Sequence, residues 1–186
     1  MVYLMRHGQD DETYVGGWSN VSLIEEGRKQ AKEAALWIKK NLHIKSIQCS
    51  DVKRAIETTE IVSEVLGVPY TLNSNLREQN KGKLNGVEKA IAYSAHPEFK
   101  GKNVTVDTVF PDGESLRNLY DRINDYLNEI LKMDDDILLI THRGVINMIY
   151  FILNNKDVDM DKKQFGVTTG SIHELDKEKM IIKKVR

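Results

Sequence analysis

The sequence predicts an α/β sandwich with a mostly parallel central sheet. Short apolar runs typical of buried strands alternate along the chain with longer segments in which apolar residues recur at helical spacing. Strands and helices that alternate in this way favour parallel strands joined by helices that cover the sheet. The 186 residues, of which 40% are hydrophobic, suffice for a real core, so we expect a single domain over residues 1–186.

The first strand and the first helix are predicted from residues 2–5 and from a segment that begins at Ser22. Residues 2–5 are continuously apolar and stop at Arg6, which is typical of a buried strand. Ser22 and Glu25 form a capping-box pattern, in which each side chain bonds the backbone amide of the other residue. The helix that this pattern starts should run to about Asn41.

A second strand, a second helix and a third strand follow. Residues 44–49 and 68–72 have the length and the apolar content of short strands. Between them, Ser50 or Asp51 is expected to cap a helix, and Gly67 lies just past its expected end. Cys49 ends the second strand and is expected to be a buried structural cysteine.

Residues 73–113 have no sustained periodicity except a possible short helix over residues 87–94. They contain four glycines and two of the three prolines. A loop of this length within a compact domain is usually a lid or a binding segment. We therefore expect a lid or insertion segment within the single domain.

The rest of the chain returns to regular alternation. Helical spacing recurs over residues 114–133, residues 136–140 are the clearest buried strand, and a helix is expected over residues 144–153. Residues 171–175 and 180–185 are predicted to form a closing hairpin.

Composition limits the classes of partner. Lys and Arg number 27 against 28 Asp and Glu, so the net charge of -1 gives no bulk attraction for nucleic acid or an anionic membrane. No apolar run is long enough to span a bilayer, and the N-terminus lacks the layout of a signal peptide. With one cysteine, an internal disulfide is excluded. We expect a cytoplasmic protein with no nucleic-acid or membrane partner, either a monomer or a homodimer.

Polar residues follow the predicted strands at the points where these strands end. In open α/β sheets, ligands bind beyond the carboxyl ends of the strands. Two histidines, three arginines and one carboxylate are thereby predicted to converge at one edge of the sheet; they are Arg6, His7, Arg54, Arg77, Glu78 and His142.

These residue types match phosphoryl transfer. Arginine forks bind phosphate oxygens bidentately, so Arg6 and Arg54 can hold a phosphoryl group. A neutral imidazole such as His7 can attack phosphorus and form a covalent intermediate. A second, protonated histidine, His142, would add positive charge in the transition state. Glu78 is the candidate to protonate the leaving alkoxide, provided that its pKa is raised.

Six segments, in order along nearly the whole chain, resemble the histidine phosphatase superfamily, which includes cofactor-dependent phosphoglycerate mutases and many small phosphatases. The segments are Leu4-Met5-Arg6-His7-Gly8-Gln9, Gly17-Trp18-Ser19 with Leu23 to Gly27 and Gln30-Ala31, Ser50-Asp51-Val52-Lys53-Arg54-Ala55-Ile56-Glu57-Thr58, Leu76-Arg77-Glu78-Gln79 with Gly82 and Gly86, Pro111-Asp112-Gly113-Glu114-Ser115 and Thr141-His142-Arg143-Gly144.

The resemblance implies a three-layer α/β/α sandwich of the phosphoglycerate mutase type and a transient phosphohistidine at His7. It implies that Arg6, Arg54 and His142 line the phosphate pocket, that Glu78 is the proton donor, and that no metal or other cofactor is needed. The substrate expected from it is a small phosphorylated metabolite.

Two arginines extend the predicted substrate-binding set. Arg77 directly precedes Glu78. Arg143 stands where a small glycine is common in the family, and its cation either reaches a substrate anion or is solvated.

The chain departs from the family pattern after the Arg-His-Gly signature. Many members have Ser or Thr followed by an Asn that helps to hold phosphate, whereas this chain has Asp10-Asp11-Glu12-Thr13. No residue here can be assigned the role of that Asn. Three acids near the pocket would repel a polyanionic substrate unless they turn outward.

Four functions are compatible with these residues to different degrees. The leading hypothesis is a phosphomonoesterase that acts on a small metabolite. A mutase is the alternative within the superfamily, but the segment after Glu78 is shorter than the mutase insertion. A metal-dependent enzyme could use His7, His142 and Glu78 as ligands, although neighbouring arginines would repel the metal. A non-catalytic module that binds phospholigands would be expected to have lost one of the key residues.

Overall fold

The computed structural model describes residues 1–101, 104–134, 136–161 and 163–186. These residues contain a six-stranded sheet in the order β3-β2-β4-β1-β5-β6. Strands β1 to β4 are mutually parallel, whereas β5 runs antiparallel to β1 and pairs with β6 as a hairpin. The bounds are β1 Val2–Arg6, β2 Ser46–Cys49, β3 Tyr70–Leu72, β4 Ile137–Thr141, β5 Ile172–Asp176 and β6 Ile181–Lys184. The predicted parallel sheet and closing hairpin are confirmed.

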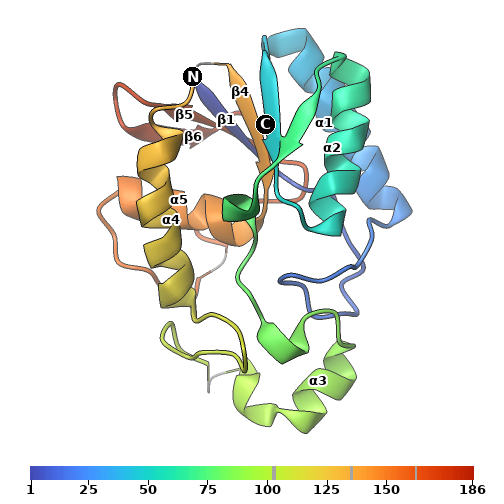
Figure 1. The fold of residues 1–186 in the computed structure, drawn as a ribbon, viewed down its shortest axis with the longest axis vertical. Coiled ribbons are helices and arrows are strands. Elements are labelled where there is room, and N and C mark those ends of the chain that lie inside the picture. The colour runs from blue at the N-terminus through green and yellow to red at the C-terminus, as the bar shows by residue number, and fades with distance from the viewer. Residues whose placement is uncertain (102–103, 135, 162) are drawn as a thin grey trace.

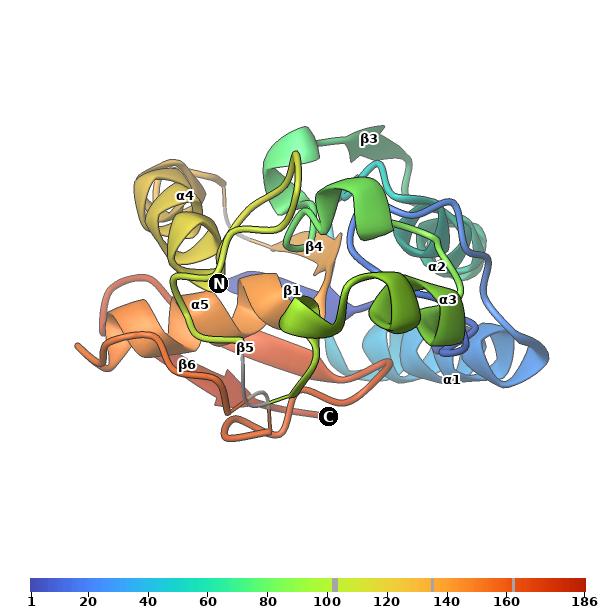
Figure 2. The same cartoon turned by 90° about the horizontal axis from the view of Figure 1, so that it is seen from below.

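Helices cover both faces of this sheet (Figure 1). Helices α1 (Glu25–Asn41) and α2 (Lys53–Leu66) lie on one face, and α4 (Leu116–Ile130) and α5 (Arg143–Leu153) lie on the other. The view from below in Figure 2 shows the same two layers on either side of β1 and β4. The three-layer α/β/α sandwich is therefore confirmed.

Side chains that alternate along the central strand β1 pack into the apolar clusters on both faces of the sheet. Val2 and Leu4 of β1 belong to the apolar cluster formed with α4 and α5, whereas Tyr3 and Met5 belong to the cluster formed with α1 and α2. Because successive strand side chains point to opposite faces, a continuous apolar run is what a strand buried on both faces requires. Cys49 is buried in the second cluster, and burial raises the pKa of its thiol to about 11, as expected for a structural cysteine.

The predicted capping box at Ser22 and Glu25 is wrong. Helix α1 starts at Glu25 behind an extended Ile24, with no side-chain cap among the described residues. Instead, the amide of Ile24 donates to the carbonyl of Gln9 at 3.0 Å, and the amide of Leu23 donates to Glu57 Oε2 at 2.7 Å. Contacts with distant segments therefore position the start of this helix.

The start of α2 also differs from the prediction, while its end agrees. Its N-cap is Val52, not Ser50 or Asp51, and no capping hydrogen bond from a side chain is present among the described residues. Gly67 ends the helix with φ 70°, in the left-handed region that glycine adopts without strain.

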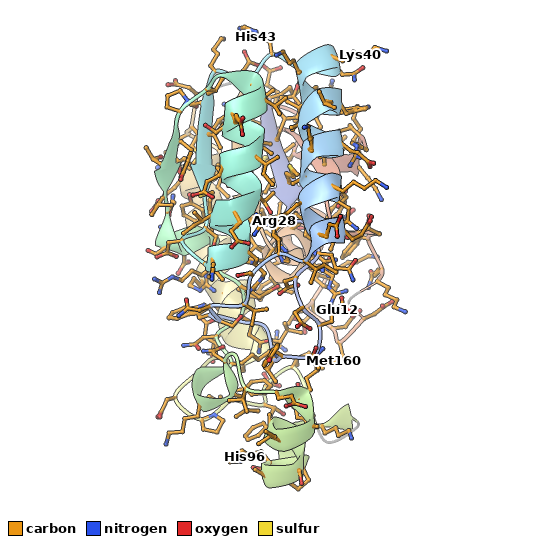
Figure 3. The ribbon with its side chains drawn as sticks, turned by 90° about the vertical axis from the view of Figure 1, so that its right-hand side faces the viewer. Glu12, Arg28, Lys40, His43, His96 and Met160 are labelled. Atoms are coloured by element: carbon orange, nitrogen blue, oxygen red, sulfur yellow. The ribbon has the colours of Figure 1, made fainter. Side chains whose placement is uncertain are left out.

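The described part of residues 73–113, which is 73–101 and 104–113, lies beyond the carboxyl ends of the parallel strands. It contains α3 (Lys89–Ala95) and the short 3₁₀ turns Ser74–Leu76, Gly82–Leu84 and Pro97–Phe99. Leu84, Ala92 and Phe110 form a small apolar cluster with Val15, separate from the two clusters of the sandwich. In Figure 3, His96 marks this end of the molecule, opposite His43 and Lys40. No helix in the described residues is long and apolar enough to cross a bilayer.

Candidate active site

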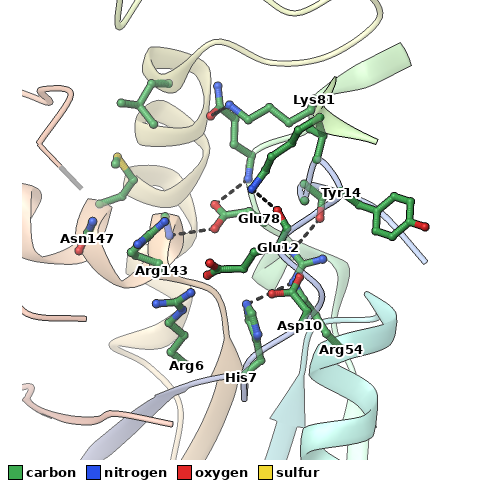
Figure 4. Close-up of a pocket in the computed structure, with 18 of the residues that line it drawn as sticks. Arg6, His7, Asp10, Glu12, Tyr14, Arg54, Glu78, Lys81, Arg143 and Asn147 are labelled. Atoms are coloured by element: carbon green, nitrogen blue, oxygen red, sulfur yellow. Dashed lines mark hydrogen bonds and ion pairs between the residues drawn. The ribbon is translucent and has the colours of Figure 1, made fainter. Parts of the chain in front are cut away.

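A cavity of about 230 Å³ lies between the carboxyl ends of the parallel strands and the segment that carries α3. Arg6 and His7 reach it from the end of β1, Arg54 from the first turn of α2, and Arg143 from the first turn of α5 (Figure 4). Glu78 enters from the loop after β3. The cavity is smaller than the roughly 300–1,000 Å³ of pockets that hold drug-sized ligands.

The imidazole of His7 is held in one tautomer. Its Nδ1 lies 2.6 Å from the carbonyl oxygen of Gly8, and its Nε2 lies 3.2 Å from Nε of Arg54. Because arginine only donates, Nε2 of His7 must accept and its proton must reside on Nδ1. Burial, together with Arg54 and Arg6, holds the pKa of His7 well below 6.5. His7 is therefore a neutral imidazole with its lone pair on Nε2.

Arg54 contacts both histidines of the site, His7 and His142. Its guanidinium is buried and donates to Ser19 Oγ at 3.2 Å, to the carbonyl of Gly17 at 2.8 Å and to Nδ1 of His142 at 3.1 Å. Its Nε also lies 3.5 Å from Asp10 Oδ2. These partners hold the fork in a single orientation beside both histidines.

Arg6 retains an unused donor. Its Nη1 donates to the carbonyl of Val167 at 3.1 Å, whereas its buried Nε has no hydrogen-bond partner within the described part of the chain. Burial and the neighbouring Arg143 lower the pKa of Arg6 to about 10, so the group stays charged at neutral pH. A buried donor without a partner is costly, and an oxyanion in the cavity would satisfy it.

His142 is neutral in the resting structure, and, contrary to the expectation that it lines the phosphate pocket, it is not among the residues that line the cavity. Its Nδ1 accepts from Arg54, so its Nε2 carries the proton and donates to Ser50 Oγ at 2.8 Å. Burial, and then the charge of Arg54, hold its pKa well below 6.5. The ring is completely buried, and its centroid lies 5.0 Å from that of His7.

Glu78 is ionised, and the expected raised pKa is wrong for the resting structure. Burial acts to raise its pKa, but the amides of Gln79 and Gly144 donate to its two oxygens at 2.9 and 3.1 Å. With the charges of Arg54 and Lys81, these bonds hold the pKa of Glu78 below 4.5. The carboxylate thus rests on the N-terminus of α5, where the helix dipole also favours an anion.

Gly144 makes this placement of Glu78 possible. A Cβ atom at residue 144 would lie 1.9 Å from Oε1 of Glu78, which is far inside van der Waals contact. Only glycine therefore lets the carboxylate approach the first turn of α5 so closely.

Arg77 does not line the cavity. Its guanidinium makes two hydrogen bonds with the carboxylate of Asp51, at 2.6 and 2.5 Å, and lies 4.5 Å above the ring of Trp18. Trp18 in turn donates from Nε1 to the carbonyl of Glu78 at 2.7 Å. Arg77 and Trp18 thus pack the loop that carries Glu78, whereas Arg143, which the sequence left open, lines the cavity.

Two of the three consecutive acids turn inward. Asp10 and Glu12 line the cavity, whereas Asp11 bonds the amide and the hydroxyl of Thr13 outside it. The charge of Asp10 is partly offset by Arg54.

Thr58, Glu114 and Arg122 support the site, although none of them was among the predicted site residues. Thr58 accepts from the amide of Gly8 at 3.1 Å and so anchors the turn that carries His7. It lies one helical turn after Arg54, a spacing that could have indicated its direction. Glu114 accepts from the amide of Asn80 at 3.0 Å and pairs with Arg122, which bonds the carbonyl of Arg77 at 3.2 Å. No sequence pattern linked Arg122 to this loop.

The described residues include no group of three His, Cys, Asp or Glu side chains placed to hold a metal ion. Nε2 of His7 and Nδ1 of His142 both accept hydrogen bonds from Arg54.

A family model described as the histidine phosphatase superfamily, branch 1, matches residues 2–185. The chain belongs to the histidine phosphatase superfamily. This histidine phosphatase is similar to phosphoglycerate mutase-like protein 4 of Arabidopsis thaliana, with 33% identity over 159 residues that cover 80% of this chain and 69% of that protein. The family expected from the six sequence segments is confirmed.

Solved structures share the fold of this histidine phosphatase. The mycobacterial glucosyl-3-phosphoglycerate phosphatase in complex with inorganic phosphate matches with a TM-score of 0.78 and 24% identity, covering 100% of this chain and 95% of that chain. YhfR of Bacillus stearothermophilus matches with a TM-score of 0.78 and 23% identity, covering 94% and 91%. At this identity, the likeness establishes the fold.

Proposed function

We propose that this histidine phosphatase hydrolyses small phosphomonoester metabolites through a phosphohistidine at His7, without a metal ion. The observation that carries this proposal is the neutral imidazole of His7, whose proton is on Nδ1 and whose Nε2 lies beside the guanidinium of Arg54. A neutral imidazole beside a cationic group that can bind a phosphoryl group supports the proposal.

Binding of a phosphoryl dianion engages Arg6, Arg54 and Arg143. One oxygen takes the unused Nε donor of Arg6, and another takes the hydrogen bond that Arg54 gives to His7 at rest. This exchange frees the lone pair on Nε2 of His7. The dianion also raises the pKa of His142, because an opposite charge nearby favours its protonated form.

In the first step, Nε2 of His7 forms a bond to phosphorus as the bond between phosphorus and the ester oxygen breaks. Glu78 supplies the proton that the leaving oxygen needs. The carboxylate is ionised at rest, but a phosphoryl dianion beside it raises its pKa, since like charges disfavour the ionised form. Glu78 can therefore take up a proton when substrate binds and deliver it to the leaving group.

In the second step, water attacks the phosphohistidine. Glu78, now a carboxylate, accepts a proton from that water as its oxygen bonds to phosphorus and the P–N bond breaks. Inorganic phosphate leaves, and His7 returns to its neutral state. The arginines neutralise charge on the equatorial oxygens in both steps.

The hydrogen bonds from Arg54 to His7 and His142 support a reaction that needs no metal ion. A metal held by His7, His142 and Glu78 would need the ring nitrogens that accept from Arg54, and it would lie against that guanidinium. A divalent cation is repelled there, whereas an oxyanion is attracted.

Mutase-type phosphoryl transfer is the second candidate, because the Arabidopsis relative is named phosphoglycerate mutase-like. A mutase must retain a phosphorylated intermediate with two anionic groups. The carboxylates of Asp10 and Glu12 in the cavity favour hydrolysis of a monoester instead.

The test is a phosphate-release screen over a metabolite library, with a chelator present throughout. We expect turnover of at least one small monoester, a burst of product with an activated aryl phosphate, and a phosphorylated His7 trapped by acid quench. His7→Ala should lose all three signals while its circular dichroism spectrum is retained.

Three other results of this screen would each support a different function. Activity that disappears with chelator and returns with a divalent metal supports the metal enzyme. Phosphate transfer to phosphoglycerate without net release supports the mutase. Tight binding without a burst or turnover supports a binding module.

A further inference from the structure

The cavity carries balanced formal charge. Among the described residues that line it, five are cationic and five are acidic. The arginines are grouped around His7, where a phosphoryl group would bind. The cations are Arg6, Arg54, Lys81, Lys89 and Arg143, and the acids are Asp10, Glu12, Glu78, Asp159 and Asp161. The arginines near His7 suit one phosphoryl dianion, and the lining has no net positive charge left to attract a second anion.

Four of these five acidic side chains already have hydrogen-bond or ion-pair partners. Asp10 lies near Arg54, and Glu78 accepts two backbone amides. Asp159 and Asp161 accept from backbone and side-chain groups of their own loop. The carboxylate of Glu12 has no hydrogen bond or ion pair with any residue that the structure describes, although its side chain lines the cavity.

The position of Glu12 is nevertheless defined. Lys89 donates from Nζ to the carbonyl oxygen of Glu12, and the amide of Lys89 donates to the carbonyl of Thr13 at 2.9 Å. Its backbone is thus tied to the start of α3. In Figure 4 the carboxylate points into the cavity, toward Arg6 and Arg143. Its charge acts on Arg6, where it favours the protonated guanidinium.

The lysines at the cavity do not cancel this charge by direct pairing. Nζ of Lys89 donates a hydrogen bond to the backbone carbonyl of Glu12, not to its carboxylate. Lys81 donates to Gln79 Oε1 at 2.6 Å and lies 3.9 Å from the ring centroid of Phe110. A leaving group beside the phosphate therefore meets the open carboxylate of Glu12.

We propose that Glu12 is a specificity-determining residue, which favours phosphomonoesters whose alcohol carries an ammonium group and disfavours those with a second anion. The inference rests on the proposed function, because the leaving group is defined by a phosphoryl group bound at His7. The substrate class is therefore small amino-alcohol phosphates, not phosphorylated carboxylic acids.

Three esters of similar size test this proposal: 2-aminoethyl phosphate, ethyl phosphate and carboxymethyl phosphate. They differ in the charge of the group two carbons from the ester oxygen. Their dissociation constants are measured by calorimetry at 0.15 M salt in a His7→Ala background, which binds without forming a phosphohistidine. Glu12→Gln is compared with Asp11→Asn, which removes the same charge from the neighbouring residue, whose carboxylate bonds Thr13 outside the cavity.

With Glu12 present, we expect the order of affinity 2-aminoethyl, then ethyl, then carboxymethyl phosphate. Glu12→Gln should lower the preference for the ammonium ester over the carboxylate ester about tenfold, which corresponds to about threefold for each charge across partly hydrated space. Ethyl phosphate should change less than about twofold, and Asp11→Asn should leave the preference within about twofold, because salt screens charges beyond roughly 8 Å.

An unchanged preference in Glu12→Gln, an equal change in Asp11→Asn, or no binding of the three esters overturns the inference. None of these results bears on the proposed function. That function is decided by turnover and by phosphohistidine formation in protein that retains His7.

Discussion

The floor and the rim of the cavity differ in burial and in the way that their side chains are held. The floor consists of Arg6, His7 and Arg54, which line the cavity and are at most 9% exposed, and His142 is buried beside Arg54 without lining the cavity. The rim consists of Glu12, Lys89 and Asp159, which are exposed residues outside the strands of the sheet. Buried hydrogen bonds orient the floor, whereas the rim faces solvent.

This difference separates two tasks. Charges in a buried, prearranged site act strongly, because little solvent reorganises around them. Charges on an exposed rim are screened and act weakly on any single ligand. The floor therefore suits chemistry that every substrate shares, and the rim suits the choice among substrates. The following predictions test this division, beginning with the largest effect.

Arg54→Gln should lower kcat by about 10³-fold, because it removes both a phosphoryl ligand and the group that orients His7 and His142. Arg77→Gln is the matched control, since Arg77 pairs with Asp51 outside the cavity. It should change kcat less than about fivefold, because its role is confined to packing. Steady-state kinetics with an aryl phosphate measures both variants.

Comparable losses in the two variants would contradict the division between a catalytic floor and its surroundings. They would mean that Arg77 reaches the substrate in the working enzyme.

Gly144→Ala should lower kcat for an alkyl phosphate by about a hundredfold, at the lower end of the roughly 10²–10⁴-fold contribution of general acid catalysis. The new Cβ would lie 1.9 Å from Glu78 Oε1 and so must displace the proton donor. An aryl phosphate, whose leaving group needs little protonation, should lose much less and serves as the internal control. Glu78→Gln should show the same dependence on the leaving group in stronger form.

If alkyl and aryl esters lost activity equally in Gly144→Ala, Glu78 would not be the acid that protonates the leaving group. The substitution would then act on phosphoryl binding instead.

Buried neutral histidines should make stability depend on pH. Burial lowers the pKa of His173 from 6.5 to about 4, and the pKa values of His7 and His142 also lie well below 6.5. Between those values and 6.5, the unfolded chain binds more protons than the folded chain, so the free energy of unfolding falls as pH decreases below 6.5. Each histidine contributes up to about 1.4 kcal/mol per pH unit.

Denaturant unfolding from pH 7.5 to pH 4.5 measures this slope. His173→Gln, which leaves the floor intact, should reduce the slope by about one histidine's share, near 1.4 kcal/mol per pH unit. A slope unaffected by the substitution would show that His173 is protonated in the folded protein.

Much of the fold could be predicted from the sequence because its signals are local. Apolar runs and helical spacing depend on neighbours along the chain, and they located the strands that end at Arg6 and Thr141. Once the sheet was known to be parallel, the strand-end rule placed His7, Arg54, Glu78 and His142 at one edge. The start of α1 could not be predicted, because the backbone of Gln9 and the side chain of Glu57 position it.

The sequence by itself determined which family the chain belongs to, and it placed Arg6, His7, Arg54 and Glu78 at the site. Only the tertiary structure decided how the side chains are charged and oriented: burial and then Arg54 keep His142 neutral, two amides keep Glu78 ionised, and Asp51 holds Arg77 outside the cavity. It also turned Glu12 inward and Asp11 outward. The physical reason is that protonation and side-chain direction depend on burial and on partners many residues away in the chain.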